Sequence, residues 1–452
     1  MRQQGVDGGG IGVIDLGDGW GDEEEVSLPA RPGLGWRRRI ALAATALIVL
    51  VGASAAARPQ GAGLRQLALR EAVVGSMTLL GADMVAVQSR EVITGWGLSD
   101  GALRWQVPVS GEIYSFFGIA DLLVVSQGTG APAEHEYQYP PVETTAYDAG
   151  TGKVRWYADR VLRPIRDRWL LAYRVHPDRT EEVEAHDPRD YRLLWRTPPS
   201  LTSAVDEQTA TLWRLSPEGE LVEQDLADGT VRRSTKVKLP TDQRVNLTYG
   251  DDMVGLVSSD DGTVNPDGSP ADPPLPRIEL WFDRATLRPS PAGPRWAWQV
   301  DCGGGYTCAM TAAADGPRTW IIDAATGKPI VTLAGGDRGF LPSVAGPLAV
   351  GFSSLWLGPR LDGTFDPDTG GVRPAYRDWY AVQDQNGFVS YMVRPGRAAD
   401  STYLGALRSD GELRMVGEIP YELKQCLSTP QALICSTTDD RFGIWRVEAG
   451  PR

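Results

Sequence analysis

The chain has 452 residues, of which 42% are hydrophobic, and it carries a formal net charge of −13. No stretch gathers enough lysine and arginine to form a broad basic face, so the composition excludes a nucleic-acid-binding function. The 52 glycines and 33 prolines favour many turns between short strands over long helices.

Residues 1–39 contain glycine-rich and acidic runs, and such a composition cannot bury enough apolar surface to fold. We therefore expect a disordered acidic tail there. Residues 40–57 follow without a single charge, which is close to the minimum length for one transmembrane helix. Three arginines at 37–39, directly before this stretch, predict that the N-terminus is cytoplasmic.

The apolar stretch has two interpretations. Its small residues at 54–57 resemble the cleavage site of a secretory signal peptide, so a cleaved segment is one alternative. The leader of 39 residues is long for a signal peptide and favours an uncleaved signal anchor. The prediction is a single-pass protein of the cell membrane, with residues 58–63 as a linker and residues 64–450 as an extracytoplasmic domain.

The clearest local pattern lies at residues 146–156, Ala-Tyr-Asp-Ala-Gly-Thr-Gly-Lys-Val-Arg-Trp. It predicts two strands joined by a tight turn, in which Asp148 caps the turn and Gly152 adopts a positive φ. Trp156 then offers a large apolar face for packing between neighbouring sheets. The residues assigned to this structural motif in its best copies are Trp105, Asp148, Thr151, Gly152, Trp156, Asp323, Thr326 and Gly327.

Degraded copies of the motif place turns at positions 101, 152, 191, 229, 287, 327 and 411. Three of the intervals are 39, 38 and 40 residues, a period typical of the four-stranded blade of a β-propeller. The longer intervals predict inserted loops at 128–142, 260–276 and 354–378. The sequence therefore predicts an all-β protein.

The two ends of the domain each lack a complete blade. Residues 64–88 have no hairpin before them, and the chain ends about one period after the turn at 411. We expect these end segments to share one blade, which closes the ring without an open edge. This counts eight blades, with seven as the alternative because residues 328–411 are hard to divide. A further hairpin is a candidate there, formed by 379–382 and 385–387.

The four cysteines lie in two local pairs, Cys302 with Cys308 and Cys426 with Cys435. Each pair places a cysteine on both arms of an expected hairpin, which predicts two disulfides if the domain is exported. Free buried thiols are the alternative. A metal site would require closer spacing or supporting histidines, and the sequence has neither.

The pattern Ala-x-Asp-x-x-Thr-Gly-x-x-x-Trp at residues 146–156 resembles the PQQ-like β-propeller repeat of the quinoprotein alcohol dehydrogenase-like superfamily. The likeness covers roughly residues 64–450. It implies a single-pass, membrane-anchored protein of actinobacterial type with the propeller outside the cell membrane.

Enzymes of this superfamily bind pyrroloquinoline quinone with Ca²⁺, use an aspartate base and often carry a vicinal disulfide over the cofactor. This sequence has no adjacent cysteines and no Cys-x-x-Cys-His haem motif. Its acidic residues at 260–272 do not have the spacing of an EF-hand loop. We therefore predict no catalytic, cofactor-binding or metal-binding residues and no cofactor, and interpret Asp148 and Asp323 as turn caps.

The function predicted from these features is a non-enzymatic scaffold that binds a protein or another ligand through the propeller loops outside the membrane. One alternative is a quinoprotein dehydrogenase-like enzyme. Another is a transmembrane sensor that signals through the N-terminal tail.

Overall fold

The computed structural model describes residues 63–129, 142–239, 245–250, 252–258, 279–291, 298–311, 318–334, 338–351, 358–366, 368–376, 378–397 and 400–448. The predicted tail at 1–39, the predicted membrane helix at 40–57 and most of the predicted linker lie outside these residues. Every regular element in the described part is a strand. Within the same residues, no helix has the length and apolar character needed to cross a membrane.

Most of the strands form four-stranded antiparallel sheets that follow one another along the chain. The first is β2 (Val74–Leu80), β3 (Met84–Ser89), β4 (Val92–Gly97) and β5 (Leu103–Pro108), and the second is β6 (Ile113–Ile119), β7 (Leu122–Gly128), β8 (Val142–Asp148) and β9 (Val154–Ala158). The third is β10 (Leu162–Ile165), β11 (Trp169–Val175), β12 (Glu181–His186) and β13 (Leu193–Arg196), and the fourth is β14 (Thr202–Asp206), β15 (Thr211–Leu215), β16 (Glu220–Asp225) and β17 (Val231–Lys236). The fifth is β18 (Val245–Tyr249), β19 (Met253–Ser258), β20 (Glu279–Asp283) and β21 (Pro289–Ser290), and the sixth is β22 (Trp298–Gly303), β23 (Tyr306–Thr311), β24 (Arg318–Asp323) and β25 (Pro329–Ala334).

The next eight strands share a single sheet. They are β26 (Arg338–Leu341), β27 (Leu348–Gly351), β28 (Arg360–Asp366), β29 (Gly371–Pro374), β30 (Tyr380–Gln383), β31 (Val389–Pro395), β32 (Thr402–Leu407) and β33 (Leu413–Ile419). The two groups of four are joined where Arg360 of β28 pairs with Tyr380 of β30, and by a bridge between Ser343 and Val389 of β31.

The predicted insert at 354–378 is therefore wrong, because Arg360–Asp366 and Gly371–Pro374 within it form β28 and β29 of this sheet. The turn between these strands has Gly370 at a φ of 65°, and it repeats the motif as Asp366, Thr369 and Gly370. The sequence analysis missed this copy. The candidate hairpin in the same region is present as β30 and β31.

The last sheet joins the two ends of the domain. It contains β34 (Leu423–Thr429), β35 (Ala432–Thr437), β36 (Arg441–Val447) and, from the start of the domain, β1 (Leu64–Glu71). The predicted pairing of first and last strands is confirmed, since β1 is antiparallel to β36. Only β1 takes part, however. Residues 74–88 belong to β2 and β3, because residues 74–108 contain two hairpins and complete a sheet of their own.

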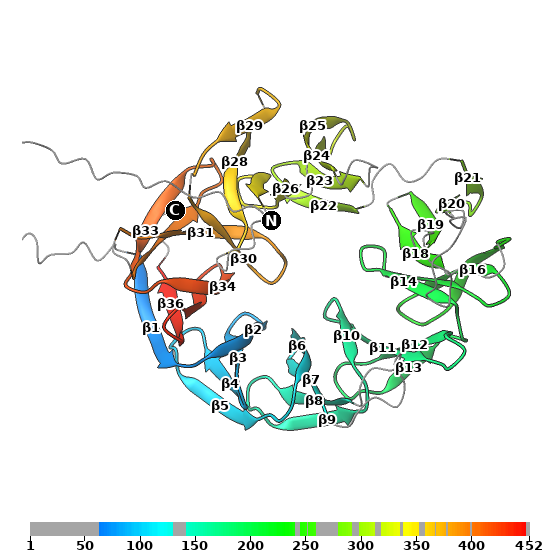
Figure 1. The fold of residues 1–452 in the computed structure, drawn as a ribbon, viewed down its shortest axis with the longest axis horizontal. Coiled ribbons are helices and arrows are strands. Elements are labelled where there is room, and N and C mark those ends of the chain that lie inside the picture. The colour runs from blue at the N-terminus through cyan, green and yellow to red at the C-terminus, as the bar shows by residue number, and fades with distance from the viewer. Residues whose placement is uncertain are drawn as a thin grey trace, which may run out of the picture. The chain divides into compact units, whose positions relative to one another are not determined.

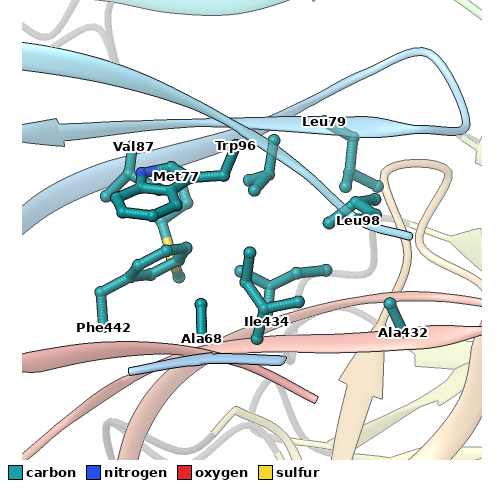
Figure 2. Packing of buried hydrophobic residues seen from close by; sticks show 11 residues of the cluster. Ala68, Met77, Leu79, Val87, Trp96, Leu98, Ala432, Ile434 and Phe442 are labelled. Atoms are coloured by element: carbon teal, nitrogen blue, oxygen red, sulfur yellow. The ribbon is translucent and has the colours of Figure 1, made fainter. Parts of the chain in front are cut away.

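The sheets succeed one another around a ring, with β2, β6, β10 and β34 toward the inside and β1, β5 and β9 toward the outside (Figure 1). Buried hydrophobic side chains fill the space between neighbouring sheets. Between the terminal sheet and the β2–β5 sheet, Met77 and Trp96 meet Phe442 and Ile434, and the rings of Trp96 and Phe442 lie 5.8 Å apart (Figure 2). Repeated four-stranded sheets packed in this way are the arrangement of a β-propeller. The blade count stays a prediction, since the described strands form seven four-stranded sheets and one sheet of eight.

Strand alternation gives the ring two different faces. In each sheet, the connection between the first and second strands and the connection between the third and fourth strands lie at the same end of the strands. We call this end the turn face. The second-to-third connections and the connections between sheets lie at the opposite end, the connector face. Residues 129–141, between β7 and β8, and residues 259–278, between β19 and β20, both join strands at the connector face. The chain enters β1 at the turn face.

Candidate functional site

The repeat motif forms the same turn in each good copy, at the turn face. In the copy after β8, Asp148 Oδ1 accepts hydrogen bonds from Thr151 N at 2.9 Å and Thr151 Oγ1 at 2.7 Å. In the copy after β24, Asp323 Oδ1 accepts from Thr326 N at 2.7 Å and Thr326 Oγ1 at 2.9 Å. These hydrogen bonds lower the pKa of both aspartates, with the Thr151 hydroxyl as the largest cause at Asp148 and the Thr326 amide at Asp323. Both carboxylates are therefore held within their own turns.

The tryptophans of the motif join each sheet to the next. Trp105 Nε1 donates to the carbonyl of Ala149 at 2.6 Å, and Trp156 Nε1 donates to that of Pro188 at 2.8 Å. Each acceptor directly follows the capping aspartate of the neighbouring turn. Gly152 has a φ of 67°, and a Cβ there would lie 2.8 Å from the Trp105 ring. The motif residues thus build the ring, and we see no chemistry for them beyond this role.

The series of links continues where the sequence pattern does not. Trp195 Nε1 donates to the carbonyl of Leu226 at 2.9 Å, in the sheet after its own. In the next sheet, Arg233 occupies the tryptophan position, four residues after Gly229, and its guanidinium donates to the carbonyl of Ala285 in the following turn. The four-residue spacing from the turn glycine identifies this arginine as the equivalent of the motif tryptophan. A search for tryptophan alone misses it.

The cysteines lie in the two predicted pairs, each at disulfide distance. The Cα atoms of Cys302 and Cys308 are 5.6 Å apart, on β22 and β23, and those of Cys426 and Cys435 are 4.2 Å apart, on β34 and β35. Three of the four side chains are fully buried. They join strands that are already neighbours and lie within the packed sheets.

The remaining candidates are divided between described and undescribed residues. The acidic stretch at 260–276 and the histidine at 135 lie outside the described part of the chain. His186 is buried, stacks on Tyr191 with ring centroids 4.1 Å apart, and has Nε2 3.2 Å from Glu184 Oε2. His176 has Nε2 3.5 Å from Glu182 Oε1. Among the described residues, no three His, Cys, Asp or Glu side chains gather closely enough to hold a metal ion.

Clefts open on both faces of the described ring. The cleft on the turn face has a volume of about 340 Å³ and is lined by Gln208, Thr209, Arg284, Gln299, Val300, Asp301 and Thr307. At its wall, Arg284 Nη2 pairs with the buried Asp206 carboxylate at 2.6 Å and is hydrogen-bonded to Thr209 Oγ1 at 2.9 Å. Gln208 Nε2 donates across the cleft to the carbonyl of Gln299 at 2.7 Å. These side chains form their ion pairs and hydrogen bonds mainly with one another, so they connect the sheets that line the cleft.

The cleft on the connector face has a volume of about 480 Å³ and is lined by Glu71, Ala72, Val73, Ser89, Arg90, Asp439, Asp440 and Arg441. It lies between the terminal sheet and the β2–β5 sheet. Val73 is exposed at its edge, and Arg441 Nε pairs with Asp439 at 3.0 Å. A mixed apolar and charged surface of this kind is typical of protein contacts more than of an enclosed small-molecule site.

The sequence matches no protein-family model and no curated protein. The chain is similar in structure to BamB from Moraxella catarrhalis, at 13% identity, over 85% of this chain and 99% of that one, with a TM-score of 0.34. It is also similar to the computationally designed protein Ika8, at 11% identity, over 84% and 98% of the two chains, with a TM-score of 0.36. A third similar structure is the C-terminal WD40 domain of Sif2, at 8% identity, over 85% and 99%, with a TM-score of 0.38. At these values the similarities give no information about function.

Proposed function

We propose that this chain is a non-enzymatic scaffold that binds a protein partner on its connector face. The observation that carries the proposal is the unequal length of the connections at the two faces. Residues 129–141 and 259–278 join strands at the connector face. At the turn face, the longest connection between the third and fourth strands of the first six sheets is residues 187–192. Long connections held by a rigid scaffold are where propellers and other repeat folds place binding residues.

The described residues at the connector face support this assignment. Val175, at the end of β11, and Leu201, just before β14, are both exposed, as is Val73 beside the cleft of about 480 Å³. Isolated exposed apolar residues are ordinary, but these three share one face with the long connections. They add apolar contact area to the described part of the connector face.

The proposal includes a membrane anchor at residues 40–57 and a propeller outside the cytoplasm. Arginines at 37–39 and the uncharged stretch after them support this topology. Since the chain enters β1 at the turn face, the connector face lies at the opposite end of the strands from the point of attachment. We also assign the domain to the PQQ-like repeat group, supported by the motif copies at 148–156, 323–327 and 366–370.

Site-specific photocrosslinking in intact cells tests the binding face. A photoreactive phenylalanine analogue at Val175 or Leu201 on the connector face should capture a discrete partner. The matched positions on the turn face are Leu103 and Val231, which are also apolar and are somewhat more exposed than Val175 and Leu201. We expect no discrete product from these two. A product from Leu103 or Val231, and none from Val175 or Leu201, would refute the assignment of the face.

Protease added to intact cells, after any outer barrier is removed, tests the anchor. Digestion of the domain together with protection of an epitope tag on residues 1–39 would support the proposed topology. A mature chain that begins near residue 58 would show cleavage and remove the anchor from the proposal.

A further inference from the structure

The β10–β13 sheet is the basic part of an acidic protein. Residues 155–196 contain ten arginines and eight acidic residues, a local charge of +2 in a chain of −13. Three of these arginines, Arg160, Arg174 and Arg196, approach a single carboxylate, that of Glu184 on β12. They come from the connection after β9, from β11 and from β13, so the fold brings together residues that are 36 positions apart in sequence.

The carboxylate lies beneath the arginines. The Glu184 side chain is 3% exposed, whereas those of Arg174 and Arg196 are 46% and 45% exposed. Glu182, directly opposite Arg174 in the ladder, is 15% exposed and its carboxylate lies near His176. Arg174 and Arg196 are thus more exposed than the carboxylates beside them, except for the exposed Asp159, which pairs with Arg160 at 2.9 Å and also interacts with the charge of Arg174.

The two outer arginines have unused hydrogen-bond donors. A guanidinium group has five N–H donors. Arg160 Nη1 donates to Glu184 Oε2 at 2.8 Å. Arg196 Nη2 lies 2.6 Å from Glu184 Oε1 without the geometry of a hydrogen bond, and Arg174 Nη2 lies 3.9 Å from the same oxygen. Both guanidinium groups thus lie within 3.9 Å of the same carboxylate oxygen, and both side chains are nearly half exposed.

We propose that Arg174 and Arg196 form a docking site for carboxylate side chains on an acidic segment of the protein partner. Paired arginines recognise carboxylates through charge-assisted, bidentate hydrogen bonds. Arg196 ends β13 and Arg160 follows β9, which places the site at the connector face. This proposal depends on the proposed function, which supplies the protein partner, and it adds that the partner carries an acidic segment. A long polyanion such as a nucleic acid does not fit, since the rest of the chain is strongly acidic and repels it.

The test uses the full chain purified in detergent and a fluorescent peptide of eight glutamates, with binding measured by anisotropy at low salt. A peptide of eight glutamines measures the binding that does not depend on negative charge. The double variant Arg174→Gln/Arg196→Gln should weaken binding of the glutamate peptide at least tenfold. The matched control is Arg189→Gln/Arg192→Gln, which removes the same charge from the turn face of the same sheet, where both side chains contact Asp187. We expect less than a twofold effect from it.

The single variant Arg174→Gln is a control for misfolding of the double variant, because Glu184 still has Arg160 and Arg196 beside it. It should weaken binding of the glutamate peptide at least threefold. Equal losses in the two double variants, or equal affinity of the parent for both peptides, would overturn the site. Displacement of the peptide by inorganic phosphate at constant ionic strength would show a general oxyanion site and overturn the assignment to a protein segment. A photocrosslinked product from Leu103 or Val231, with none from Val175 or Leu201, would instead remove the proposed connector-face scaffold, whatever the peptide does.

Discussion

Leu64 and Val447, the first residue of β1 and the last of β36, pair opposite one another in the same sheet. The two ends of the domain are thereby fixed to each other by a ladder that continues to Glu71 and Arg441. In a ring of sheets this ladder acts as the closure, because it pairs the first strand of the domain with the last one in a single sheet. The closure makes the termini part of the core.

Removal of residues 441–452 should unfold the domain. The segment contains Phe442, Ile444 and Trp445, which are at most 2% exposed, and it is the central partner of both β35 and β1. The single substitution Trp445→Ala should lower the free energy of unfolding by about 3–5 kcal/mol. Thermal unfolding monitored by circular dichroism measures both changes. Deletion of residues 449–452 alone is the control and should leave the melting temperature unchanged; a 441–452 deletion that melts like the parent would refute the closure.

Two glycines of the repeat motif should respond differently to alanine. Both Gly152 and Gly327 have a positive φ, 67° and 65°, which costs alanine about 1–2 kcal/mol. A Cβ at Gly152 would also lie 2.8 Å from the Trp105 ring, whereas a Cβ at Gly327 meets nothing within 4 Å. Gly152→Ala should therefore destabilise the protein by clearly more than Gly327→Ala in urea denaturation. Equal losses would mean that the contact with Trp105 does not matter.

Local turn chemistry made much of the fold predictable. All seven turn positions assigned from the sequence have a positive φ, including the non-glycine residues Tyr191 and Leu287. The turn at Gly370 was missed because its aspartate, Asp366, lies in a stretch rich in glycine, proline and aspartate that resembles a surface loop. Composition alone does not separate a short strand from a loop when the strand has four residues, as β29 does.

The candidate docking site could not be predicted in the same way. Arg160, Arg174, Glu184 and Arg196 have no characteristic spacing, and they meet only because three neighbouring strands and the connection after β9 bring them together. The pairing depends on register, since a shift of one residue would move Glu184 to the opposite side of the sheet. Sequence patterns near a turn are local, whereas this site is formed by pairing across strands.

Acid should weaken the turns of the repeat motif. The Thr151 hydroxyl is the largest cause of the lowered pKa of Asp148. A carboxyl group whose pKa is lower in the folded state stabilises that state above its unfolded pKa, near 3.8, and the contribution disappears as pH falls through the folded value. The melting temperature of Thr151→Val should lie below that of the parent at pH 7, and the difference should shrink as pH falls below 3.8 toward the lowered folded-state pKa.

Thr94→Val is the matched control for this pH dependence. The Thr94 hydroxyl donates to the carbonyl of Val87, which does not titrate, and accepts from Trp96 Nε1. The difference in melting temperature between this variant and the parent should not depend on pH in the same range. If Thr151→Val behaves in the same way, the hydroxyl does not set the Asp148 pKa.

Reduction of the disulfides should lower stability by a modest and similar amount at each pair. Cys302 and Cys308 are six residues apart and Cys426 and Cys435 are nine apart, so each bond closes a short loop. Loops of this length give about 2–3 kcal/mol in the chain-entropy model. Urea denaturation with and without dithiothreitol measures the change, and variants with one pair replaced by alanine assign it to each bond. A variant with all four cysteines replaced should not respond to dithiothreitol; a parent that also fails to respond would show that its cysteines are not oxidised.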